Sequence, residues 1–218
     1  APQWVVTAAH TLPRRGKLRK VSINGKSRRV ERVVIHEGYR TLPQELIQQA
    51  AATGEAGRMV SFVSSSDDIA LVRLARPVTD VAPAAIHEGS VHAGEIVRII
   101  GKGATGNGAA GYRLGAPSRT ELRRAYNEIS RVDDRWFCYR FDRPSSALPL
   151  EGALGNGDSG GPTLVQVEDQ WQLSGLASWK VIDGHMLTTR YGRYDQVTCN
   201  VRLAHYADWI RGVISGQP

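Results

Sequence analysis

Short apolar runs separated by turn residues recur along the chain, and they limit its fold more than any other feature of the sequence. In the first part of the chain these runs are residues 3–10, 21–36, 59–63 and 68–74. Residues 95–103, 135–141, 162–168 and 170–179 continue the pattern. Asn24-Gly25 stands between two such runs and is the strongest short signal for a β-hairpin. The sequence therefore predicts an all-β protein built as barrels or a sandwich.

Two segments depart from this pattern and favour helix. Helix-forming residues lie between Pro43 and Gly54, which suit the two ends of a helix, so we expect a helical insertion near residues 43–54. Residues 201–214 carry apolar side chains at helical spacing and predict a terminal helix. Its apolar face consists of Leu203, Ala207, Ile210 and Ile214.

Charge and hydropathy exclude several classes of protein. The 218 residues carry a formal net charge of +7, with basic clusters at 14–20, 28–32 and 113–124. Neither zinc-ligand spacing nor a recognition-helix pattern accompanies this charge, so we expect a solvated basic surface and no nucleic-acid partner. An anionic-polymer binder is the alternative, and steep salt dependence would reveal it. The apolar runs are too short to span a bilayer.

Glycine is abundant in residues 101–111, which read GKGATGNGAAG. This segment lacks the Lys-Ser/Thr ending of a phosphate-binding loop, so we predict an irregular loop. Two cysteines do not support a metal site. We therefore expect neither a metal nor a cofactor.

Residues 155–162 read GNGDSGGP and place Ser159 between an acid and two glycines. A serine hydroxyl becomes a useful nucleophile only beside a base that an acid orients. Glycines allow a tight turn whose N–H groups of Gly157 and Ser159 converge on one point. The same residues are also common in plain turns, so the octet alone does not decide between the two.

Two further stretches carry the argument. TAAH ends at His10, and DIAL begins at Asp68. Together with GDSGGP, and in the order His10, Asp68, Ser159, these stretches resemble the trypsin/chymotrypsin family of serine proteases. The resemblance implies that His10 is the base, Asp68 the orienting acid and Ser159 the nucleophile. Asp68, rather than the neighbouring Asp67, takes the position directly before the Ile-Ala-Leu run.

This resemblance also implies a fold of two antiparallel six-stranded β-barrels with the active site between them and a helix at the C-terminus. We expect an N-terminal barrel over residues 1–83, carrying the helical insertion, and a C-terminal barrel over residues 84–218. Relative to the family, about two strands precede the point where this sequence begins. We therefore expect the first barrel to lack its N-terminal strands in this chain.

By the same resemblance the protein is a serine endopeptidase that acts through an acyl-enzyme, with protein or peptide as its substrate. Gly157 and Ser159 are expected to form the oxyanion hole. The residues expected to bind substrate are Ala153, Leu154, Asn156, Ser178, Trp179, Lys180 and Gly192.

Specificity is where the sequence departs from the best-known members of the family. Ala153, expected at the base of the primary pocket, supplies no acid, so cleavage after Lys or Arg is not expected. Lys180 stands where the family usually has glycine. We predict cleavage after small or apolar residues, and the alternative is an acid-specific protease in which Lys180 binds Glu or Asp.

Cys138 and Cys199 are both expected near the closing strands of the second barrel. A disulfide between them would suit an exported protein, and we expect a secreted or periplasmic location. Thr11 replaces a cysteine usual in the family, so spacing alone leaves the pairing open.

Asp158 raises a separate question, because the resemblance implies that a free N-terminal ammonium binds this acid. Ala1 lies nine positions before His10, so we do not expect it to reach Asp158. We expect the sequence to be part of a longer protease. The alternatives are a separate segment that completes the first barrel, or an inactive homologue that serves as a protein-binding module.

Overall fold

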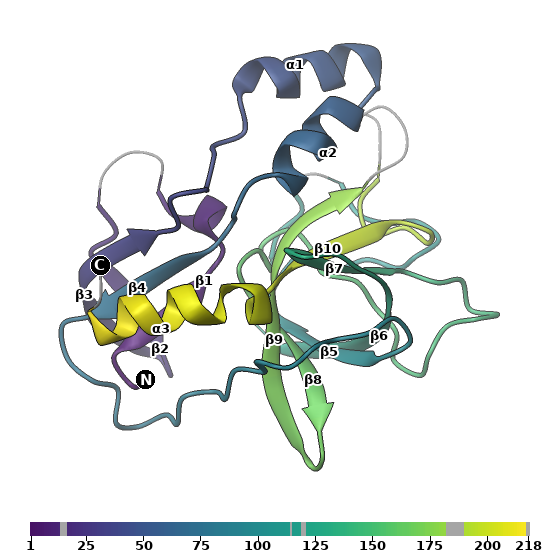
Figure 1. Cartoon of the computed structure of the whole chain (residues 1–218). Coiled ribbons are helices and arrows are strands. Elements are labelled where there is room, and N and C mark those ends of the chain that lie inside the picture. Colours follow the sequence, from purple (N-terminus) through teal and green to yellow (C-terminus); the bar gives the residue numbers. More distant parts are fainter. Residues whose placement is uncertain (14–16, 114, 119–120, 182–189, 217–218) are drawn as a thin grey trace.

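The computed structural model spans residues 1–218, and the structure describes all of them except 14–16, 114, 119–120, 182–189 and 217–218. The described part of the chain forms a four-stranded antiparallel sheet followed by a closed six-stranded barrel (Figure 1). The predicted all-β class is thus confirmed, and the first half is an open sheet as expected.

The first sheet has the order β1-β4-β3-β2. Its strands are β1 (Trp4–Thr7), β2 (Lys20–Ile23), β3 (Lys26–Ile35) and β4 (Ala70–Leu74). Asn24 and Gly25 connect β2 to β3 with φ of 51° and 70°, the left-handed pair that a tight two-residue hairpin requires. Val72 and Leu74 are buried on the inner face of this sheet.

The barrel has the order β10-β7-β6-β5-β8-β9, and pairing of β9 with β10 closes it. Its strands are β5 (Ile96–Gly101), β6 (Arg123–Val132), β7 (Trp136–Arg140), β8 (Pro162–Val167), β9 (Gln170–Val181) and β10 (Val197–Arg202). Phe137, Tyr139 and Ile129 are fully buried in its interior. Burial of such side chains contributes about 1.5–3 kcal/mol each to folding.

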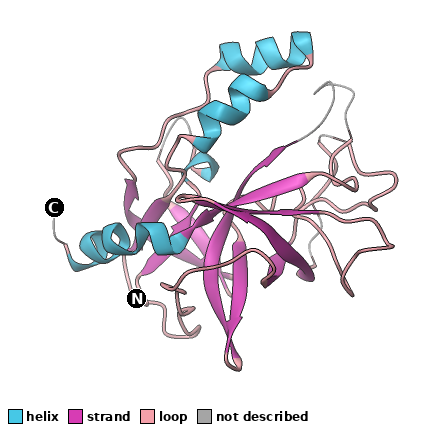
Figure 2. Cartoon of the chain, turned by 45° about the vertical axis from the view of Figure 1, so that its right-hand side comes forward, coloured by secondary structure: helices cyan, strands magenta, loops and turns pink. Residues whose placement is uncertain are grey.

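A second core joins the two halves. Ile69 and Leu71 of the first sheet pack with Trp136, Leu176 and Val201 of the barrel. The C-terminal elements complete this core, η2 (Leu203–Tyr206) and α3 (Ala207–Ser215). In Figures 1 and 2, α3 lies against the four-stranded sheet. The terminal helix is therefore shorter than predicted, since residues 201 and 202 still belong to β10.

A helical pair is inserted between β3 and β4 and projects from the strands in Figure 2. The first helix, α1 (Gln44–Thr53), agrees with the expected insertion, and Gly54 ends it at a φ of 79°. The second, α2 (Gly57–Ser64), contains residues 59–63, so the strand predicted there is wrong. Periodicity cannot separate a short apolar run in a strand from one in a helix.

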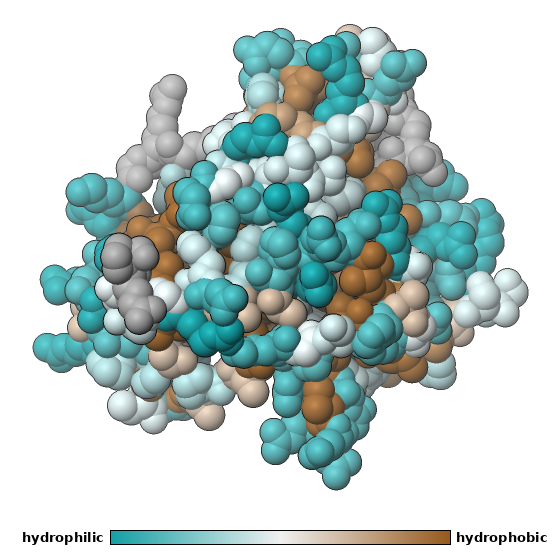
Figure 3. Space-filling view, viewed as in Figure 1, coloured by the Kyte–Doolittle hydropathy of each residue, from teal (hydrophilic) through white to brown (hydrophobic). Residues whose placement is uncertain are grey.

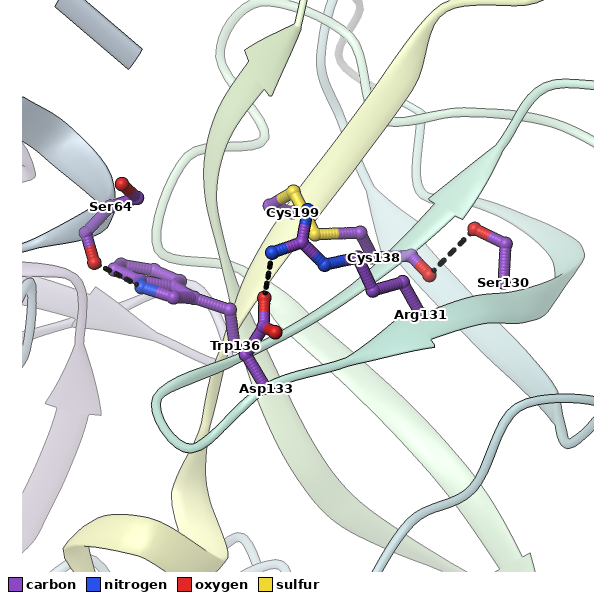
Figure 4. The surroundings of a disulfide bond; sticks show 7 residues. All are labelled: Ser64, Ser130, Arg131, Asp133, Trp136, Cys138 and Cys199. Atoms are coloured by element: carbon purple, nitrogen blue, oxygen red, sulfur yellow. Dashed lines mark hydrogen bonds and ion pairs between the residues drawn. A yellow bond between two sulfur atoms is a disulfide. The ribbon is translucent and has the colours of Figure 1, made fainter. Parts of the chain in front are cut away.

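The helical pair is tied to both halves of the molecule. The indole Nε1 of Trp136 in β7 donates to the carbonyl oxygen of Ser64 at 2.8 Å (Figure 4). The Arg40 guanidinium donates to the carbonyl oxygen of Ser65 at 3.0 Å. These bonds fix the end of α2 just before Asp68.

The remaining connections are irregular. Residues 101–111 show no helix, as predicted for this glycine-rich loop. A long connector runs from the end of β4 to the start of β5, and the predicted domain boundary between residues 83 and 84 falls within it. Figure 3 shows hydrophilic residues over most of one face, with hydrophobic residues in separate areas. No helix in the described ranges is long and apolar enough to cross a membrane.

Cys138 and Cys199 form a disulfide between β7 and β10 (Figure 4). They are direct cross-strand partners in β7 and β10, and both are almost fully buried. The bond therefore links two neighbouring strands whose cysteines are 61 residues apart in the sequence.

The disulfide predicts a stability difference. Replacing both Cys138 and Cys199 by alanine should lower the free energy of unfolding by about 2–5 kcal/mol, because the unfolded chain loses a cross-link. Urea unfolding of the oxidised protein and of the variant measures this. An unchanged midpoint and slope would contradict the prediction.

Candidate active site

His10 and Asp68 meet because β1 and β4 are antiparallel neighbours. Thr7 at the end of β1 pairs with Ala70 at the start of β4. The residues just after β1 and just before β4 therefore lie at the same end of the sheet. His10 follows in a short 3-10 turn, η1 (Ala9–Thr11), which aims it at Asp68.

Asp68 receives three hydrogen bonds at this point. The backbone N–H of His10 donates to Oδ1 at 2.8 Å, and Nδ1 of its ring lies 2.7 Å from Oδ2. The hydroxyl of Ser178 in β9 also donates to Oδ2. Because an ionised carboxylate only accepts, Nδ1 must carry the hydrogen, which leaves Nε2 of a neutral ring as an acceptor.

The environment of Asp68 favours its ionised form. Burial alone would raise the pKa of its carboxyl group. The hydrogen bond and charge of His10, with the bond from Ser178, outweigh this and hold the pKa below its ordinary value. The buried Asp68 is thus a negatively charged orienter for His10, whose side chain is 35% exposed.

Asp67 points elsewhere, although it is the adjacent residue. Its Oδ1 accepts hydrogen bonds from Arg135 Nε and from the Tyr206 hydroxyl, both at 2.7 Å. Asp67 therefore joins the first half of the molecule to the barrel and to the C-terminal elements, while Asp68 faces His10.

Ser159 lies in the same region, in the loop that precedes β8. Residues 154–160 of this loop are called the serine loop. The N–H of Gly160 donates to the carbonyl oxygen of Ala177 at 2.8 Å, beside Ser178 on β9. Gly160 has a φ of 70°, and a Cβ there would lie 2.2 Å from the Thr7 hydroxyl of β1. Only glycine therefore lets the serine loop approach the first sheet so closely.

Ser159, His10, Asp68 and Ser178 line one cavity of about 380 Å³. In the described part of the chain no hydrogen bond joins Ser159 to His10. The two side chains share this cavity.

Asp158 shapes the serine loop from the opposite side. Its carboxylate accepts the N–H of Gly103 at 2.6 Å and the N–H of Gly155 at 2.7 Å. A Cβ at Gly101 or Gly103 would come within 2.0 to 2.6 Å of this carboxylate. Asp158 therefore has partners within the chain, which sequence reasoning did not anticipate.

The expected oxyanion donors, the N–H groups of Gly157 and Ser159, belong to the residues on either side of Asp158. Gly157 has a φ of 98°, which favours glycine. Among the described residues, the N–H groups of Gly157 and Ser159 have no hydrogen-bond partner. Of these two residues, Ser159 lines the cavity.

Most of the predicted substrate-binding residues line the cavity, but two do not. Those that line it are Leu154, Asn156, Ser178, Trp179 and Lys180. Ala153 instead packs against the barrel core, and Gly192 lies against the ring of Tyr112. Other residues that line the cavity include Ala177, Tyr191 and Thr198.

One wall of the cavity was missed at the sequence level. It comes from the helical insertion and the segment before it, and consists of Tyr39, Arg40, Leu42, Met59, Val60 and Val63. Met59, Val60 and Val63 share one face of α2, a spacing that identifies their common direction once the segment is known to be helical.

Lys180 extends from β9 toward the serine loop. Its ammonium donates to the carbonyl oxygen of Leu154 and to the Tyr112 hydroxyl, the latter at 3.0 Å. Burial lowers the pKa of Lys180 to about 8, against the opposing effect of the negative charge of Asp158. The cavity therefore encloses an ammonium whose described hydrogen-bond acceptors are neutral.

A histidine, a buried acid and a serine thus line one cavity where the open four-stranded sheet meets the six-stranded barrel. The family model described as Trypsin matches residues 1–210. The chain therefore belongs to the trypsin family. Among the described residues, no cluster of histidine, cysteine and acidic side chains is arranged to hold a metal ion.

The close approach of the Asp158 carboxylate to Gly103 predicts that Gly103 does not tolerate a side chain. Gly103→Ala should lower the free energy of unfolding by about 1–3 kcal/mol, because its Cβ overlaps the carboxylate. Gly212→Ala in α3 is the matched control, since a Cβ there meets nothing and should add about 0.5–1 kcal/mol. Equal effects of the two changes on the free energy of unfolding in urea would contradict the close contact between Gly103 and Asp158.

Lys180 predicts a specific dependence of stability on pH. Its pKa is about 8 in the folded protein and 10.5 ordinarily, so between these values the unfolded chain binds more protons. The free energy of unfolding of wild type, relative to that of Lys180→Met, should therefore rise with pH across this window by about 3 kcal/mol. Parallel curves for the two proteins would contradict the burial of this ammonium.

Proposed function

We propose that the protein is a serine endopeptidase that uses Ser159 as nucleophile, His10 as general base and acid, and Asp68 as orienting acid. One observation carries this proposal: buried, ionised Asp68 holds Nδ1 of His10, and Nε2 is left for Ser159 in the same cavity. Membership of the trypsin family supports it.

In this proposal, Ser159 Oγ attacks the carbonyl carbon of a peptide bond while Nε2 of His10 takes the serine proton. The N–H groups of Gly157 and Ser159 stabilise the negative charge that develops on the carbonyl oxygen. His10 then gives its proton to the leaving amine as the C–N bond breaks. Water hydrolyses the acyl-enzyme by the same steps and restores Ser159.

The substrate proposed is an extended peptide that pairs with the backbone of Ser178 and Lys180 by β-addition. Small or apolar side chains before the scissile bond suit a cavity that includes Leu154 and Ala177. The Lys180 ammonium already has two acceptors, and we therefore rank an acidic side chain second. An ammonium has three donors, and the third is what an acidic substrate would use.

A secreted or periplasmic location accompanies this function. The buried disulfide supports it, because such bonds persist in oxidising compartments. We also propose that a further polypeptide segment covers the inner face of the first sheet. Its apolar residues Val5, Val21 and Ile23 are only partly buried.

A protein-binding module without activity is the competing proposal, and Ser159→Ala separates the two. The variant should keep its fold and lose peptide hydrolysis by about 10⁴-fold or more, since the nucleophile is gone. Initial rates on an unstructured protein substrate measure this. Equal hydrolysis by wild type and Ser159→Ala would contradict the assignment of Ser159.

Substrate preference gives a separate prediction. In a peptide series that differs only before the scissile bond, kcat/KM should be highest for alanine, valine or leucine and at least about tenfold lower for arginine. Fast cleavage after arginine would overturn the pocket assignment. Preference for glutamate would establish the acid-specific alternative.

A further inference from the structure

Lys180 joins two of the walls of the cavity, apart from the wall formed by the helical insertion. One wall is β9, which carries Ser178, Trp179 and Lys180, and the other is the serine loop over residues 154–160. The bond from the Lys180 ammonium to the carbonyl oxygen of Leu154 joins them directly. The side chain thus acts as a cross-link at the start of the serine loop.

Tyr112 extends this cross-link two residues further along the loop. Its hydroxyl accepts a hydrogen bond from Lys180 and another from the N–H of Asn156, both at 3.0 Å. It donates in turn to Oδ1 of Asn156 at 3.3 Å. Burial raises the pKa of Tyr112 to about 12, so the hydroxyl keeps the proton that it donates.

Hydrogen bonds hold the residues on both sides of Gly157. Asn156 is held by Tyr112, and its carbonyl oxygen accepts the N–H of Ala104 at 2.8 Å. On the other side, Asp158 is held by Gly103 and Gly155. Gly157 lies between two fixed residues, so the direction of its N–H depends on both.

The cost of burying Lys180 argues that the contact serves more than stability. An ammonium removed from water without a hydrogen-bonded carboxylate is unfavourable, and an apolar side chain of similar length would avoid that cost. Strongly perturbed ionisable groups in cavities are enriched at functional sites. The group that carries this cost here lies against the serine loop.

We propose that Lys180 is a positioning residue that, through Leu154 and Tyr112, holds the serine loop so that the N–H of Gly157 faces the cavity. This inference rests on the proposed protease function, in which that N–H binds the oxyanion. It assigns a role to the lysine that stands where the family usually has glycine.

Steady-state hydrolysis of a peptide with an apolar residue before the scissile bond tests the proposal. Lys180→Met should lower kcat by about 10- to 100-fold and change KM less than about threefold, because a misdirected donor loses stabilisation mainly in the transition state. Tyr112→Phe removes only the bridging hydroxyl and should lower kcat by about 3- to 10-fold. Lys20→Met, an exposed change of equal charge on β2, should match wild type.

The pH dependence of kcat distinguishes a positioning role of Lys180 from a purely structural one. Wild-type kcat should fall as pH rises through about 8, where Lys180 loses its proton, and Lys180→Met should lack this limb. The titratable groups around the ammonium are Tyr112, Tyr191 and Asp158. His10 and Asp68 line the same cavity, so the difference between the two profiles isolates Lys180.

Hydrogen–deuterium exchange tests the same cross-link without catalysis. Amides of residues 154–159 should exchange faster in Lys180→Met than in wild type, and those of β5 should not differ. Unchanged kcat together with unchanged exchange would overturn the proposal. So would a loss confined to KM for substrates with an acidic residue before the scissile bond, since Lys180 would then be a specificity residue.

Failure of the protease function would look different. Wild type would then hydrolyse no peptide, which overturns the proposed function and the oxyanion part of this inference together. If only the Lys180 inference is wrong, wild type is active and Lys180→Met is equally active with the same pH profile.

Discussion

The apolar core shared by the two halves is the constraint on which the candidate site depends. His10 and Asp68 lie at one end of the first sheet, whereas Ser159 lies in the loop before β8 of the barrel and Ser178 in β9. Ile69 lies next to Asp68 and is fully buried in this shared core, so packing places the acid against β9. Because interiors are close-packed, a small change in this packing would move Asp68 relative to Ser178.

Polar contacts then refine what packing brings together. Asp67 binds Arg135 and Tyr206 across the same junction, while Asp68 binds His10. The two adjacent carboxylates thus have separate tasks, one joining the halves and one orienting a base. On the barrel side, the Asp158 carboxylate accepts hydrogen bonds from the N–H groups of Gly103 and Gly155. Gly101 and Gly103 leave space for this carboxylate because they have no Cβ.

The sequence predicted the fold where local signals and the family resemblance agreed. The Asn24-Gly25 hairpin and the helix between Pro43 and Gly54 follow from backbone preferences that few residues satisfy. β6 was not anticipated, because its exposed residues, including Arg123 and Arg124, obscure the alternation expected of a strand. Residues 59–63 were assigned to a strand because a short apolar run does not reveal its period.

The sequence predicted which side chains of the candidate site carry the chemistry, but it did not predict most of the residues that line the cavity. His10, Asp68 and Ser159 stand in short distinctive motifs, whereas Met59, Val60 and Tyr112 reach the site only through tertiary packing. Ala153 was expected at the base of the primary pocket, but it packs against the barrel core and does not line the cavity. Nothing in the sequence near Lys180 indicates that its ammonium would meet Leu154 and Tyr112.

Covalent labelling shows directly whether the cavity activates Ser159 toward an electrophile. The folded protein is treated at neutral pH with a fluorophosphonate, and the modified residue is located by peptide mapping with mass spectrometry. Activation by His10 should give one adduct, on Ser159, that forms much more slowly in His10→Ala. A folded protein that forms no adduct, or one modified at another residue while Ser159 stays free, would contradict it.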